Sequence, residues 1–245
     1  MDASPPAPQS TAIKILKLLL KLGISVLCLW YVSGKINWKD AKDALQSANV
    51  GWMALAALAF VLSKVFSSVR LLIYFRDIGV PLSQTSNLHL YWLGMFYNLF
   101  LPGAISGDAY KVILLKKWFE TPYKKSGAAV LLDRLSGVIA LGLLLALYSW
   151  FVFEPLWIPG ILTVGAVAGI LVLQFIINRW MRDFKKSYLS TLLWGLAVQG
   201  MQVVCVYCIM AGFGLDISVS AYIFLFPFIV SCCGIATYSW RTGNT

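Results

Sequence analysis

Charged residues are scarce in this sequence, and their scarcity excludes an ordinary soluble protein. They make up 12% of the 245 residues, against ~25% in typical soluble domains. Hydrophobic residues reach 60%, and a soluble fold of this size could not bury so much apolar surface. The composition also excludes a disordered chain and a small disulfide scaffold. We therefore predict an all-α fold, a polytopic bundle of transmembrane helices.

Residues for metal or nucleophilic chemistry are also few. His89 is the only histidine, so a histidine metal site or a Ser-His triad has little support. Cys205 and Cys208 have C-x-x-C spacing, but they lie in an apolar run without a second ligand pair. The sequence has no P-loop, no dinucleotide-binding glycine motif and no nucleophile elbow. We expect no metal, no cofactor and no catalytic residue, which disfavours an enzyme acting on lipid phosphates.

The net charge of +10 is better explained by membrane topology than by nucleic-acid binding. The cations lie between apolar segments, as they do when lysine and arginine stay on the cytoplasmic side. We expect no nucleic-acid partner. The expected location is a bacterial or archaeal inner membrane, crossed several times, with the N-terminus in the cytoplasm.

Long apolar runs predict about six spanning helices within one transmembrane domain, residues 13–240. Residues 1–12 are rich in proline and serine, which predicts a disordered tail, and 241–245 form a short C-terminal tail. A run of about 20 apolar residues suffices to cross the hydrocarbon. The runs that we interpret as spans are 22–32, 51–75, 127–153, 157–178, 189–215 and 221–240.

The segment 87–115 is apolar but broken at Pro102 and Gly103, with Gly107 shortly after. Proline cannot continue a regular helix, and broken helices at membrane depth recur around transporter cavities. A re-entrant hairpin here would place every basic cluster, including 111–125, on one side of the membrane. Two full crossings by short half-spans would also fit, and a simple proline kink is the plainer alternative.

Ionisable residues within apolar runs are costly in a membrane and are therefore functional candidates. Asp133 and Arg134 are neighbours, and adjacent residues point about 100° apart on a helix, so each needs a partner elsewhere. We expect Asp108 to pair with Arg134, and Arg70 to pair with Asp133. These could be structural ion pairs, or Arg134 with Lys111 or Arg70 could receive a lipid phosphate. Asn98 is a further candidate for the head-group cavity, although neutral polar residues in apolar runs more often join helices.

Two phrases resemble a known family. They are Asn98-Leu-Phe-Leu-Pro-Gly-Ala-Ile-Ser-Gly-Asp-Ala-Tyr-Lys111 and Val130-Leu-Leu-Asp-Arg-Leu-Ser-Gly137. They resemble the transmembrane region of lysylphosphatidylglycerol synthases, also called flippase-like membrane proteins. In that family the first phrase usually has a pair of glycines, of which this chain keeps the second as Gly107 and has Ser106 in place of the first, and an arginine where this chain has Lys111. The resemblance implies a helical inner-membrane protein with re-entrant segments, whose Asp108, Asp133 and Arg134 line a cavity for lipid head groups.

The resemblance also shapes what we expect of activity and partners. The family's late Gly-Arg-Glu phrase is missing before the chain stops at Thr245, which suggests a shortened standalone member. The synthases' soluble transferase domain is absent from these residues, so lysyl transfer is not expected. We expect membrane phospholipids as ligands, translocated or presented across the bilayer. The alternative is a non-transporting scaffold for a glycosyltransferase or lipid synthase, and a homo-oligomer stays open.

Overall fold

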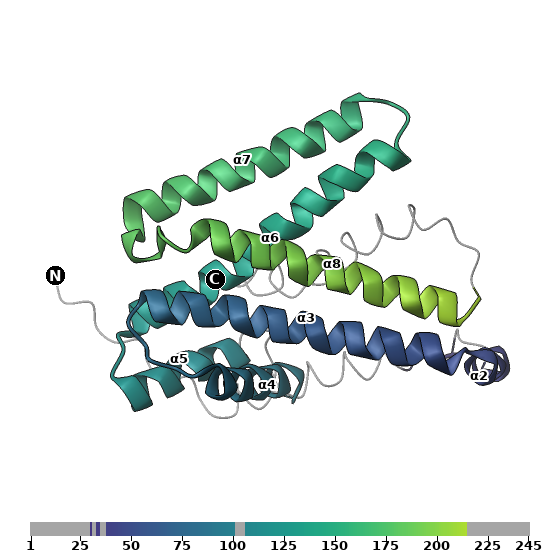
Figure 1. Ribbon diagram of the computed structural model, residues 1–245, viewed down its shortest axis with the longest axis horizontal. Coiled ribbons are helices and arrows are strands. Elements are labelled where there is room, and N and C mark those ends of the chain that lie inside the picture. The colour runs from purple at the N-terminus through teal and green to yellow at the C-terminus, as the bar shows by residue number, and fades with distance from the viewer. Residues whose placement is uncertain (1–29, 31–32, 35–37, 101–105, 215–245) are drawn as a thin grey trace. The chain divides into compact units, whose positions relative to one another are not determined.

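The computed structural model describes residue 30, residues 33–34, 38–100 and 106–214 of the chain. The described residues fold into helices and loops without a strand (Figure 1), which confirms the predicted all-α class. The chain divides into two compact units, Met1–Ser47 and Ala48–Thr245. In the first unit a helix not predicted from the sequence, α2, covers Trp38–Ser47.

Four long helices of the second unit are apolar enough to cross a membrane. The predicted spans are confirmed with small shifts of their ends, and the expected spans 22–32 (apart from Trp30) and 221–240 lie outside the described residues. The shortest of the four has 24 residues, or about 36 Å at 1.5 Å per residue. Their bounds are α3 Val50–Asp77, α6 Tyr123–Val152, α7 Trp157–Trp180 and α8 Tyr188–Gly212.

Helices α3 and α8 lie side by side in opposite directions and form the most extensive helix pair (Figure 1). At one end, the Asn49 amide donates to the Gly212 carbonyl over 2.8 Å. Farther along, the Tyr74 hydroxyl donates to Thr191 Oγ1 over 2.9 Å. Helix α6 packs against both, whereas α7 packs mainly on α6. Arg70 of α3 and Asp133 and Arg134 of α6, discussed below, are therefore carried by helices that pack against each other.

The segment predicted as a re-entrant hairpin forms two short helices, α4 Gln84–Phe100 and α5 Ser106–Phe119. At 14 residues, α5 is about 21 Å long, too short to cross ~30 Å of hydrocarbon. Leu82 lies just before α4 and Phe119 at the end of α5, and both line one pocket. The hairpin therefore begins and ends at the same end of the unit. The two helices pack against each other as the arms of a hairpin, whereas its re-entrant course in the membrane stays a prediction. Pro102 and Gly103 lie outside the described residues.

The hairpin packs along the C-terminal half of α3. The Asn87 amide of α4 donates to the Ser68 carbonyl over 2.6 Å and to Ser68 Oγ over 2.8 Å. Leu90 from α4 and Leu115 from α5 join the apolar core formed around Leu71 and Phe75 of α3. Both arms are thus fixed to the same stretch of α3.

Basic side chains gather at the end of the unit where the hairpin opens. Lys125 Nζ contacts Asp183 Oδ2 at 2.9 Å, which brings the start of α6 to the short 3-10 helix η1, Arg182–Phe184. Ser187 Oγ donates to Asp77 Oδ1 over 2.7 Å, which brings the start of α8 to the end of α3. We call this the basic end. Its cations are Arg76, Lys116, Lys117, Lys124, Lys125, Arg179, Arg182, Lys185 and Lys186.

Candidate functional site

The first ion pair of the site joins α3 to α6. Arg70 Nε contacts Asp133 Oδ1 at 2.7 Å, and the two side chains are only 7% and 12% exposed. The sequence-based pairing of these residues is confirmed. Because both charges are removed from water, each depends on the other for its stability.

Two glycines make room for the Arg70 guanidinium. A Cβ on Gly137 of α6 would lie 3.2 Å from Arg70 Nη1, and one on Gly195 of α8 would lie 3.4 Å from the same atom. Arg70 Nη1 is buried and has no hydrogen-bond partner within the described part of the chain. The arginine is therefore enclosed by three helices, and one of its nitrogens keeps hydrogen-bonding capacity.

The second ion pair joins the hairpin to α6. Arg134 Nε contacts Asp108 Oδ2, and Lys111 Nζ contacts the other oxygen, Asp108 Oδ1, at 3.2 Å. The predicted pairing of Asp108 with Arg134 is confirmed, and Lys111 shares the same carboxylate. The exposures differ sharply, since Arg134 is 49% exposed while Asp108 and Lys111 are 8% and 6%. Arg134 is the most open member of the site.

Tyr91 of α4 lies between the two ion pairs. It interacts electrostatically with Arg70, Asp133 and Asp108, and the Lys111 ammonium stands 4.8 Å from the centre of its ring. Sequence reasoning did not single out Tyr91, because a tyrosine in an apolar helix carries no signal of its own. Tyr91 thus lies close to residues of both ion pairs, and we treat the charged residues as one group. We call this group the charged cluster: Arg70, Asp108, Lys111, Asp133 and Arg134.

The inner end of the hairpin is held by close backbone packing. The Gly107 amide donates to Asn98 Oδ1 over 2.8 Å, so the predicted role of Asn98 in joining helices is confirmed. A Cβ on Gly107 would overlap the Gly94 carbonyl, and one on Gly94 would overlap the Lys111 side chain. Gly107 thus lies in the first turn of α5, where its missing side chain lets α4 approach. Gly94 was not predicted, since nothing in its sequence neighbourhood marks it.

The charged cluster lies between a quarter and a third of the way along α3 and α6 from the basic end. Asp133 follows the start of α6 by ten residues and Asp108 precedes the end of α5 by eleven. At 1.5 Å per residue these distances are about 15 and 16.5 Å from the basic end, so both carboxylates lie well inside the helices. In the described part of the chain, no group of three His, Cys, Asp or Glu residues could hold a metal ion.

The sequence comparisons agree with this geometry. The family described as the lysylphosphatidylglycerol synthase TM region matches residues 18–235, nearly the whole chain. The chain belongs to this family. It is also 25% identical over 183 residues to a UPF0104 membrane protein of Pyrococcus horikoshii. That match covers 74% of this chain but 53% of the relative, so it spans about half the relative's length. No solved structure matches significantly.

Family membership makes the chain an integral membrane protein with several spanning helices. The cluster residues on α5 and α6 come from the two phrases that carried the resemblance, whereas Arg70 comes from α3. Gly94 and Gly195 are positions that only the fold brings to the site.

Proposed function

We propose that this protein binds the anionic head group of a membrane phospholipid at the charged cluster and moves or presents it across the bilayer. The observation that carries the proposal is the charge balance of the cluster inside the bundle. Arg70, Lys111 and Arg134 supply three positive charges, and Asp108 and Asp133 supply two negative ones. An excess cation so far from the membrane surface is costly unless an anion accompanies it.

The position of Arg134 supports a ligand rather than a purely structural role. Its Nε is held by the buried Asp108, yet 49% of the side chain is exposed. A guanidinium carries its N–H donors in a planar fork, which matches the geometry of a phosphate. Arg70, by contrast, is enclosed and paired with Asp133, and we assign it the role of positioning α6.

We also propose that the basic end faces the cytoplasm. It carries nine cations and the carboxylates Asp77, Glu120 and Asp183, whereas the α6–α7 loop at the opposite end carries Glu154 and no cation. Cytoplasmic loops of membrane proteins are enriched in lysine and arginine. In this orientation the hairpin enters from the cytoplasmic side and the charged cluster is reached from the inner leaflet.

Lipid movement in proteoliposomes tests the proposal. Fluorescent phosphatidylglycerol and phosphatidylcholine are compared with wild type, Arg134→Ala and Lys125→Ala. Each variant removes one cation of an ion pair, but the Lys125–Asp183 pair is about half exposed and lies at the basic end. We expect wild type and Lys125→Ala to move phosphatidylglycerol, and Arg134→Ala to lose that movement. Equal movement by Arg134→Ala would refute the role of the cluster.

A scaffold that holds a glycosyltransferase or lipid synthase is the second candidate, and the basic end favours it. Lys124 and Lys125 are exposed there and offer a surface for an acidic partner. This function predicts no lipid movement by folded wild type. It also predicts loss of partner recruitment in Lys124→Gln Lys125→Gln and full recruitment by Arg134→Ala, the reverse of the pattern that a translocator gives.

A further inference from the structure

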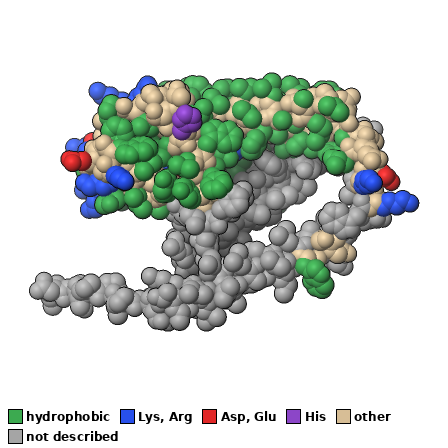
Figure 2. Space-filling view, turned by 90° about the horizontal axis from the view of Figure 1, so that it is seen from below, with side chains coloured by type: hydrophobic (Ala, Val, Ile, Leu, Met, Phe, Trp, Pro, Cys, Tyr) green, Lys and Arg blue, Asp and Glu red, His purple; other side chains and the backbone are tan. Residues whose placement is uncertain are grey.

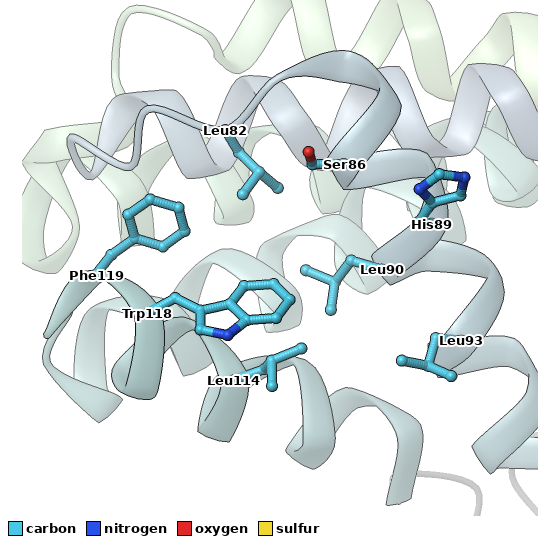
Figure 3. A pocket seen from close by; sticks show the side chains of 8 residues that line it. All are labelled: Leu82, Ser86, His89, Leu90, Leu93, Leu114, Trp118 and Phe119. Carbon is cyan, nitrogen blue, oxygen red and sulfur yellow. The ribbon is translucent and has the colours of Figure 1, made fainter.

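A groove separate from the charged cluster lies between the two arms of the hairpin. It encloses about 290 Å³ and is lined mainly by apolar side chains (Figure 3). Leu90 of α4 and Leu114 and Trp118 of α5 converge at its centre. Its polar lining comes from Ser86 and His89, and His89 lies at the edge of the view in Figure 3. None of these residues belongs to the ion pairs of the site.

The groove runs inward from the basic end over about the hydrocarbon depth of one leaflet. It begins at Phe119, the last residue of α5, and reaches Leu93, nine residues into α4. Nine residues correspond to about 14 Å of helix. An apolar groove at this depth faces hydrocarbon rather than water. Because the hydrocarbon consists of lipid acyl chains, an acyl chain is the group available to fill the groove.

The mouth of the groove is positively charged. Lys117 is exposed and follows Leu114 by three residues, which places both on one side of α5. Figure 2 shows lysine and arginine side chains gathered at the end near His89, drawn in purple, with apolar surface extending away from them. The Ser86 hydroxyl accepts a hydrogen bond from Ser83 over 2.9 Å, so its own proton can be donated to an anion. Trp118, 54% exposed, belongs to the residue type enriched at membrane interfaces.

We propose that this groove binds one anionic phospholipid of the basic-side leaflet, with an acyl chain between α4 and α5 and the phosphate beside Lys117 and Ser86. Its apolar lining fits the chain, its length fits the hydrocarbon depth of one leaflet, and its rim complements the head group's charge. The site would hold a lipid at the end of the hairpin that lies at the basic end. Asp108 lies at the hairpin's other, inner end. The assignment rests on the membrane orientation proposed above and not on lipid movement.

Photocrosslinking tests the site in the full-length protein. The protein is reconstituted with phosphatidylglycerol that carries a diazirine within one acyl chain, and crosslinked peptides are mapped by mass spectrometry. We expect crosslinks at Leu90 and Leu114 to exceed those at Leu171, a lipid-facing residue of α7 that is 60% exposed. Leu114→Trp fills the groove and should reduce the hairpin crosslinks about tenfold, equivalent to ~1.4 kcal/mol, without changing those on α7.

Ile113→Trp is the matched control, because Ile113 adjoins Leu114 in sequence, is 54% exposed and does not line the groove. It should leave the crosslinks unchanged. Lys117→Gln should reduce the preference for phosphatidylglycerol over phosphatidylcholine about fivefold, the effect of one basic residue near a membrane surface. Equal crosslinking of α7 and the hairpin, or no effect of Leu114→Trp, would overturn the site. Lipid movement that persists in Leu114→Trp would leave the translocation proposal intact, so the two fail separately.

Discussion

Removing the charge of Asp133 is the most informative perturbation of the fold. In Asp133→Asn, the Arg70 guanidinium keeps its position between α3, α6 and α8 but loses the carboxylate 2.7 Å away. With the arginine side chain 7% exposed, water cannot replace that carboxylate. Breaking a buried pair by removing one partner costs about 3–5 kcal/mol, because the remaining charge stays buried. We expect a loss of about 3 kcal/mol in the free energy of unfolding.

The measurement is equilibrium unfolding in mixed micelles, followed by circular dichroism. Asp183→Asn removes the same charge from the Lys125 pair, whose side chains are 50% and 47% exposed, and exposed pairs contribute only about 0–1 kcal/mol. Arg70→Met Asp133→Leu removes both buried charges and should recover most of the stability lost in Asp133→Asn. If Asp133→Asn and Asp183→Asn are equally stable, the description of the Arg70 pair as a buried, mutually dependent unit is refuted.

Three further predictions concern the hairpin and the orientation. Gly107→Ala should destabilise the protein by about 1–3 kcal/mol, because its Cβ overlaps the Gly94 carbonyl. Gly127→Ala, whose Cβ meets nothing within 4 Å, should not destabilise the protein, and thermal melts followed by circular dichroism compare the two variants. Asn98→Ala should lower the free energy of unfolding by about 1–3 kcal/mol, because the Gly107 amide loses its acceptor. Asn98→Asp retains an acceptor and should lower it less, and equal losses in the two variants would contradict this. In a background without native cysteines, Lys124→Cys and Glu154→Cys should react with a membrane-impermeant thiol reagent from opposite sides, and labelling from one side would contradict the topology.

Much of this arrangement was predictable because the membrane restricts both charge and backbone. The break near Pro102, combined with the basic clusters on either side, predicts a hairpin from the sequence alone. The pairings of Arg70 with Asp133 and of Asp108 with Arg134 followed because each intramembrane charge needs a counter-charge, and both are confirmed.

The remaining features depend on how helices pack, which the sequence pattern does not encode. Gly94 is important only because α5 crosses it at Gly107, and Gly195 only because Arg70 reaches α8. Tyr91 gains its role from neighbours on three other helices. Helix α2 was missed because its polar sequence, WKDAKDALQS, carries no membrane signal.

The central claim is that a polar head group can reach the charged cluster inside the bundle, and thiol accessibility at Arg134 tests it most directly. Arg134→Cys and Leu147→Cys, both on α6 and with parent residues 49% and 57% exposed, are compared in the cysteine-free background. Only a thiol in contact with water ionises and reacts readily. We expect a small cationic thiol reagent to label Arg134→Cys from the basic side and to leave Leu147→Cys unlabelled. An Arg134→Cys thiol that is unreactive from both sides in folded protein would contradict the account.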